Sequence, residues 1–272
     1  MDIVREVAGK GGVARRRELE KAGFSGHEIL KAVQDGRLSR PIRGVYVTPD
    51  ADPALLAAAC VKAELACVNA AERLGLWILT KPRFIHVCVD HGRPLEGNFR
   101  VHRSAKQLTP LDICLQCMRC LPELEALCVV ESAVVKRLVT LQQLRSRTGG
   151  ARDRKLRRIV GMIDPHSQSI LETAARYRLK AGGFSVQTQV YVKGVGRLDL
   201  FVEGILGIEA DGREHHTNAK EFEEDRRRGN VLMLNGTPVL RATYQLIVDR
   251  PEEFVELVRR GIAKYRPTKV AG

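Results

Sequence analysis

The sequence lacks the features that would place it in a membrane or among secreted, disulfide-stabilised proteins. No apolar run reaches the roughly 20 residues that a membrane-spanning helix requires, so we expect no membrane association. The first residues, MDIVR, do not follow the pattern of a signal peptide. The seven cysteines are odd in number and lack the spacing of a small secreted domain. These absences predict a cytoplasmic protein with reduced thiols.

Acidic residues are scarce relative to basic ones. The 272 residues include 45 Lys and Arg but 32 Asp and Glu, which gives a net charge of +13. The hydrophobic fraction of 44% supports buried cores, and the length allows two or three domains. An excess of positive charge favours a polyanionic partner, and we expect double-stranded DNA. A basic protein without such a partner is the alternative.

The first 50 residues have the pattern of a small DNA-binding domain. Ser25 and Glu28 have the spacing of a capping box, and a hairpin is predicted over residues 37–47. Three short helices are predicted before it, over residues 2–10, 14–22 and 26–35. Three helices and a hairpin form a winged helix-turn-helix, whose third helix enters the major groove; a protein–protein module of the same shape is the alternative. The predicted DNA contacts are Lys31, Arg37, Arg40 and Arg43.

Two runs in this region carry a family resemblance. GGVARRRELEKAGFS (residues 11–25) and LSRPIRGVYV (residues 38–47) resemble the N-terminal domain of AbiEi antitoxins, from abortive-infection, type IV toxin–antitoxin systems. The resemblance implies a winged helix that binds operator DNA in a phage-defence context. It also makes a toxin protein, besides a second copy of this chain, a candidate partner. The resemblance continues weakly into AAERLGLW (residues 70–77).

Residues 51–160 are predicted to form an α+β spacer domain that ends in a basic linker, with a helical segment over residues 53–74 and strands over residues 84–89 and 99–103. Three cysteines inside it have C-x2-C-x2-C spacing, which can hold zinc or an iron–sulfur cluster. However, leucines and a methionine recur around them at helical spacing, and no histidine or fourth cysteine follows closely. We therefore predict buried helix cysteines and no stoichiometric zinc or iron, with a metal as the alternative. The three residues are Cys114, Cys117 and Cys120.

A group of acidic residues interrupts two apolar strands that are predicted over residues 198–202 and 205–210. Glu209 and Asp211 are two positions apart and face the same side of a strand, and Asp199 lies on the neighbouring strand. Buried carboxylates are unfavourable unless they are paired or hydrogen-bonded. Because no lysine is adjacent, three converging carboxylates suit a hard divalent ion. The sequence predicts that these three residues bind Mg²⁺ or Mn²⁺.

Residues 161–272 resemble the PD-(D/E)xK nuclease superfamily, and within it the group related to the very-short-patch-repair (Vsr) endonuclease. The predicted element order is αβββαβ with one further helix, over residues 251–265. The motifs that carry the resemblance are LET at Glu172, QTQV at Gln189, RLDL at Asp199, IEADGREH over residues 208–215, DRRR over residues 225–228 and VLRAT at Arg241. The resemblance implies Mg²⁺-dependent cleavage of DNA, with Asp199 and Glu209 as metal ligands. Asp211 would support that site, and Glu172 would orient or complete it.

This chain departs from the superfamily at one position, because Asp211 stands where many members carry lysine. The positive charge beside the scissile phosphate must then come from elsewhere. A histidine follows the strand carboxylate at similar spacing in the Vsr-like group, which implies that His215 accepts the proton of the attacking water. His215 could instead begin the next helix or contact phosphate. The predicted DNA contacts in this domain are Arg226, Arg228 and Arg241.

These patterns predict an α/β and α+β multidomain protein. It would consist of a winged helix-turn-helix domain (1–50), an α+β spacer (51–160) and a restriction-endonuclease-like domain (161–272). The predicted function is Mg²⁺-dependent DNA cleavage, by nicking or by double-strand hydrolysis. The alternative is a non-catalytic DNA-binding repressor or antitoxin with a vestigial nuclease fold.

Overall fold

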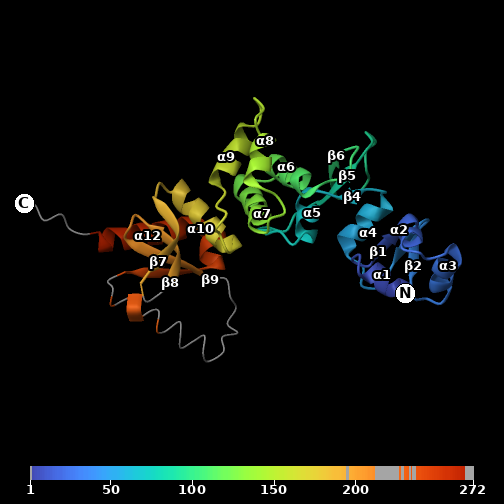
Figure 1. Ribbon diagram of the computed structural model, residues 1–272, viewed down its shortest axis with the longest axis horizontal. Helices are drawn as coiled ribbons and strands as arrows, with labels where there is room; N and C mark the ends of the chain where they lie inside the picture. The colour runs from blue at the N-terminus through green and yellow to red at the C-terminus, as the bar shows by residue number, and fades with distance from the viewer. Residues whose placement is uncertain are drawn as a thin grey trace, which may run out of the picture. The chain divides into compact units, whose positions relative to one another are not determined.

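The computed structural model describes residues 2–193, 196–211, 227, 230–232, 234 and 237–266 (Figure 1). The chain divides into two compact units, residues 1–120 and 121–272. Both units combine helices with small sheets, which confirms the prediction of a mixed α/β and α+β protein. The finer division at residues 50 and 160 stays a prediction. Among the described helices, none is long and apolar enough to cross a membrane.

The first unit begins with three helices and a small antiparallel sheet of strand order β1-β3-β2. The three predicted helices and the hairpin are confirmed. The prediction of helix at residues 14–15 is wrong, because these residues pair with the strand Val45–Val47 as β1. The elements are α1 (Ile3–Ala8), β1 (Val13–Arg15), α2 (Arg16–Lys21), α3 (Gly26–Gln34), β2 (Ser39–Ile42) and β3 (Val45–Val47).

Helix α3 is fixed at its start by the predicted capping box. The Ser25 hydroxyl accepts a hydrogen bond from the Glu28 N–H at 3.2 Å, and the Glu28 carboxylate accepts one from the Ser25 N–H at 2.7 Å. Ile29 packs in the core with Leu19 and Phe24, so one face of α3 is buried. The opposite face remains available to a partner.

The hairpin ends in a turn at Gly44, which has a φ of 84° that suits glycine. Strand β2 lies at the edge of the sheet. Its register with β3 shifts between Ser39 and Ile42, so Arg40 and Pro41 lie in a β-bulge. Proline fits this position because it has no N–H to donate to a ladder.

The first unit continues with a second three-stranded sheet, of order β4-β5-β6, in which β5 and β6 are parallel. Both predicted strands, β5 and β6, are confirmed. The helical segment predicted over residues 53–74 is interrupted, because Lys62 and Cys67 adopt positive φ angles of 58° and 48°. The elements are α4 (Pro53–Cys60), β4 (Glu64–Leu65), α5 (Cys67–Arg73), β5 (Ile85–Val89), β6 (Phe99–Arg103) and α6 (Pro110–Cys120).

The second unit begins with helices and contains a buried ion pair between two of them. The helices are α7 (Glu123–Val135), α8 (Leu141–Ser146), α9 (Arg154–Met162) and α10 (Ile170–Ala181). Arg176 of α10 donates to the Glu131 carboxylate of α7 at 2.5 Å, and both side chains are almost fully buried. The Thr173 hydroxyl and the Asp164 N–H donate to the same carboxylate. Helix α7 therefore packs closely with α10.

A four-stranded sheet of order β10-β9-β8-β7 follows in the second unit. Strands β9 and β10 are parallel, and the other neighbours are antiparallel. Helix α12 packs closely on β9, where a Cβ at Gly261 would come within 2.9 Å of Leu206. The elements are β7 (Val186–Val192), β8 (Gly196–Val202), β9 (Leu206–Asp211), β10 (Val239–Thr243), the π-helix η1 (Gln245–Asp249) and α12 (Pro251–Tyr265).

Candidate functional site

The candidate site of the second unit lies where β8 and β9 stop pairing. Leu200 opposite Ile208 is the last described pair of this ladder, and Asp199 and Glu209 follow it on the two strands. The Asp199 carboxylate accepts a hydrogen bond from the Ala210 N–H at 2.9 Å. Both acidic residues are half-buried. The fold thus brings these two carboxylates to neighbouring strands at one point of the sheet.

Helix α10 adds a third carboxylate, that of Glu172, which is 6% exposed. It accepts hydrogen bonds from the Gln168 N–H and the Gln189 side-chain amide, both at 3.0 Å. Burial raises the pKa of the Glu172 carboxyl, and the nearby negative charge of Asp199 acts in the same direction, whereas the Gln168 hydrogen bond opposes them. Glu172 is therefore not the solvent-facing residue that a helix position alone would allow. It lies near enough to Asp199 to be affected by its charge, and its role in the site stays a prediction.

The raised pKa of Glu172 predicts a pH-dependent stability difference for Glu172→Gln. A carboxyl group whose pKa is higher in the folded than in the unfolded state contributes to the free energy of unfolding while it is neutral. This contribution is lost as pH rises from about 4.5 through the folded-state value. Glutamine stays neutral at every pH. The unfolding free energy of the variant, relative to that of wild type, should therefore increase as pH rises across this window. Urea unfolding at several pH values measures the difference. Parallel pH profiles for the two proteins would contradict it, and Glu252→Gln, an exposed carboxyl of α12, is the control.

Arg241 of β10 lies beside Glu209, whereas Asp211, the third predicted metal ligand, lies at the end of β9. Arg241 is the register partner of Glu209, and its Nε lies 3.3 Å from Glu209 Oε2. Asp211 is exposed at the end of β9. Among the described residues, the carboxylate oxygens of Asp199, Glu209 and Asp211 do not all lie within 4.8 Å of one another. Their assignment as metal ligands stays a prediction.

Three residues predicted for this site lie outside the described part of the chain. They are His215, Arg226 and Arg228. The roles predicted for them, proton acceptor and DNA contacts, also stay predictions.

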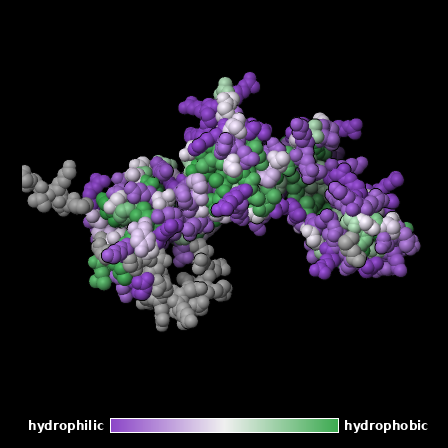
Figure 2. All heavy atoms as spheres, in the orientation of Figure 1, coloured by the Kyte–Doolittle hydropathy of each residue, from purple (hydrophilic) through white to green (hydrophobic). Residues whose placement is uncertain are grey.

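The predicted DNA-contacting residues of the first unit are all exposed. Lys31 lies on α3, and Arg40 and Arg43 lie in the hairpin and its turn. Arg37 precedes the hairpin and lies 3.5 Å from the Asp35 carboxylate. Figure 2 shows a mostly hydrophilic surface over this part of the first unit. The arrangement can present positive charge to a phosphate backbone.

The three cysteines with C-x2-C-x2-C spacing do not all lie in the same environment. Cys114 and Cys117 are fully buried in α6, as predicted, and burial raises the pKa of the Cys114 thiol to about 12. Cys120, at the end of α6, lies with Cys67, His86 and His102, and the side chain of Cys117 contacts that of Cys67. No local motif marks this group in the sequence, because its members are separated by long stretches of chain.

Comparison with known proteins finds a family match at the beginning of the chain. A family model described as transcriptional regulator, AbiEi antitoxin, matches residues 1–49. The predicted resemblance of the N-terminal region to AbiEi antitoxins is thereby confirmed, and this region is similar to a DNA-binding regulator domain. No curated protein matches the chain. The predicted resemblance of residues 161–272 to Vsr-like nucleases remains a prediction.

Proposed function

We propose that this protein is a metal-dependent DNA endonuclease of the PD-(D/E)xK, Vsr-like type, and that its antitoxin-like N-terminal region brings it to DNA. One observation supports the catalytic part above all others. Two acidic side chains of neighbouring strands, Asp199 and Glu209, lie where β8 and β9 stop pairing, and the charge of Asp199 acts on the buried Glu172 of helix α10. An acidic residue as strongly buried as Glu172 suits a site in which it holds or orients a charged group.

The donor set fits the metal that such a reaction uses. Mg²⁺ and Mn²⁺ prefer carboxylate oxygens, and when bound such an ion activates water and neutralises phosphate charge. Asp199 and Glu209 would hold the ion, and Asp211 would support it from the strand end.

Neighbouring residues would supply the other functions that the reaction requires. Arg241 lies beside Glu209 and carries a positive charge at the site. We assign to it the contact with the scissile phosphate that lysine makes in many superfamily members, because Asp211 cannot make it. Glu172 and Gln189 are hydrogen-bonded to each other and would orient the site. His215 would accept the proton of the attacking water.

Two observations favour the second candidate, a non-catalytic DNA-binding repressor or antitoxin. The matched family is described as a transcriptional regulator. In addition, Arg241 pairs with Glu209 in the way that would stabilise a carboxylate without a metal. In this case a toxin protein or a second copy of the chain would be its further partner.

One experiment distinguishes these functions. The full chain is incubated with supercoiled plasmid and Mg²⁺ or Mn²⁺, with EDTA as control. The endonuclease converts the plasmid to nicked or linear DNA only when the metal is present. A protein that shifts the plasmid in a gel but cuts it with neither metal would support the repressor.

DNA binding by the N-terminal region has its own prediction. The double variant Arg40→Ala and Arg43→Ala should bind duplex DNA more weakly, and the log–log slope of its salt dependence should decrease by about 0.9 for each phosphate that it no longer neutralises. Fluorescence anisotropy over a salt series measures both quantities. Lys62→Ala removes an exposed positive charge outside the matched residues and serves as control. An unchanged slope in the double variant would show that the hairpin does not bind phosphates.

A further inference from the structure

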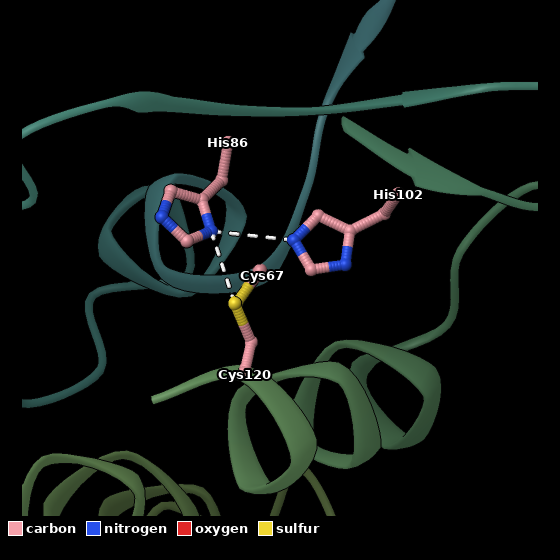
Figure 3. A group of neighbouring side chains, drawn as sticks. All are labelled: Cys67, His86, His102 and Cys120. Atoms are coloured by element: carbon pink, nitrogen blue, oxygen red, sulfur yellow. Dashed lines mark hydrogen bonds between the residues drawn. The ribbon is translucent and has the colours of Figure 1, made fainter. Parts of the chain in front are cut away.

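Two cysteines and two histidines of the first unit meet in one place (Figure 3). His86 lies on β5 and His102 on the adjacent parallel strand β6. Cys67 is the first residue of α5, and Cys120 is the last residue of α6. Four separate elements thus direct their thiol and imidazole groups toward one point.

The strand register explains why both imidazoles face the same way. Cys88 is the register partner of His102, and His86 lies two positions before Cys88 on the same strand. Residues two apart on a strand share a face, so His86 and His102 lie on one side of the sheet. Their rings are stacked with centroids 5.4 Å apart.

The distances match the edges of a coordination tetrahedron. Zinc–nitrogen and zinc–sulfur bonds of about 2.0–2.1 and 2.3 Å place two tetrahedral nitrogens about 3.3 Å apart, and a nitrogen and a sulfur about 3.6 Å apart. His86 Nδ1 lies 3.2 Å from His102 Nε2 and 3.9 Å from Cys120 Sγ. One ligand atom from each of the four residues lies within 4.8 Å of every other.

We propose that Cys67, His86, His102 and Cys120 bind one zinc ion. Two thiolates and two imidazoles in four-coordinate arrangement are a donor set typical of structural zinc. Four donor atoms this close surround a single ion, whereas the irons of a cluster would hold their ligands farther apart. Protein side chains supply all four coordination positions of the zinc ion, which leaves none open for a water or a substrate. The site is therefore structural rather than catalytic.

The chain around the ligands supports this assignment. Cys67 is fully buried and has a φ of 48°, a left-handed conformation that a non-glycine residue rarely adopts. Its N–H donates to the Gln116 side chain at 3.0 Å, and the His86 N–H donates to the Asn69 side chain at 2.8 Å. These hydrogen bonds fix the backbone at two ligands. Ligand residues held by surrounding hydrogen bonds are typical of metal sites.

The zinc ion would connect two strands to two helices in a region with short strands. Strand β4 has two residues, and β5 and β6 have five each. Sheets this small gain stability from a metal that binds only the folded form. This proposal departs from the sequence-based expectation of no stoichiometric zinc or iron, and in it Cys120 binds with partners that lie far from it along the chain.

The test uses the full chain, expressed with zinc in the medium and purified under reducing conditions without chelator. Elemental analysis should find about one zinc per chain. Replacement of the metal by Co²⁺ should produce the visible absorption of tetrahedral, thiolate-bound cobalt. Neither measurement depends on a variant that folds poorly. A protein without zinc that also gives no cobalt absorption would overturn the proposal, as would iron in place of zinc.

Two variants locate the site. Cys120→Ser should lose the zinc and the cobalt absorption, because it removes one ligand. Cys114→Ser makes the same change at a buried cysteine of the same helix and should retain both. Zinc retained in Cys120→Ser, or removed equally by both substitutions, would overturn the assignment of ligands. Circular dichroism of both variants establishes that they are folded.

Discussion

Asp199→Asn should abolish metal-dependent cleavage of plasmid DNA while the second unit remains folded. Asparagine keeps an oxygen that can accept the hydrogen bond from the Ala210 N–H, but it removes the negative charge that the metal requires. Metal-ion catalysis supplies several kcal/mol of transition-state stabilisation, so the cleavage rate should fall by about 10²–10⁴. Loss of the Asp199 charge also relieves its repulsion with Glu172, so stability should not decrease.

Initial rates of plasmid nicking at saturating Mg²⁺ measure this effect, and circular dichroism checks the fold. Asp249→Asn makes the same chemical change at an exposed residue of the same unit and should cleave at the wild-type rate. If Asp199→Asn cleaves DNA as fast as wild type, Asp199 is not a metal ligand. If no form of the protein cleaves DNA but all bind it, the repressor function is supported instead.

Arg176→Met should be among the most destabilising single substitutions in the second unit. The Arg176 side chain is 3% exposed and its partner Glu131 is 0% exposed, so the substitution leaves a buried carboxylate without its cation. Breaking one side of a buried ion pair costs about 3–5 kcal/mol. The hydrogen bonds from Thr173 and the Asp164 N–H cannot compensate for the missing charge. Urea unfolding of the full chain measures the destabilisation, and hydrogen exchange of the α10 amides assigns it to this unit.

A second ion pair provides the control. Arg158 pairs with Glu123, and its side chain is 66% exposed, so Arg158→Met should cost at most about 1 kcal/mol. Equal effects of the two substitutions would contradict a special role for the buried pair. The double variant Glu131→Leu and Arg176→Met should recover much of the stability, because apolar replacement of a whole buried pair is often neutral.

The sequence predicted the longer elements well because their periodicity is strong. Helix α12 has the predicted bounds, Pro251–Tyr265, and strands β5 and β6 lie within one residue of their predicted ranges. Short strands were missed. Strand β1 exists because three residues pair with β3, and β4 because two residues pair with β5, and such pairing is invisible in local propensity.

In the candidate sites, too, the sequence predicts the arrangement of residues that are close along the chain, but not of residues that only the fold brings together. The closeness of Glu209 to Asp211 is a consequence of strand spacing and could be predicted. The pairing of Glu209 with Arg241 depends on the register of two parallel strands, which a single sequence does not specify. The zinc ligands are 19, 16 and 18 residues apart along the chain, far beyond the spacing of a recognisable cysteine motif. Only the fold brings them together.

The bulge in β2 also affects how this protein meets other protein chains. An exposed edge strand is a template onto which a strand of another molecule can pair, and regular edges therefore favour aggregation. Here Pro41 supplies no N–H and the bulge breaks the regular spacing of the edge. A second chain therefore cannot extend this sheet in register across the hairpin. The same edge remains free to approach a nucleic acid, which needs exposed side chains rather than a continuous backbone ladder.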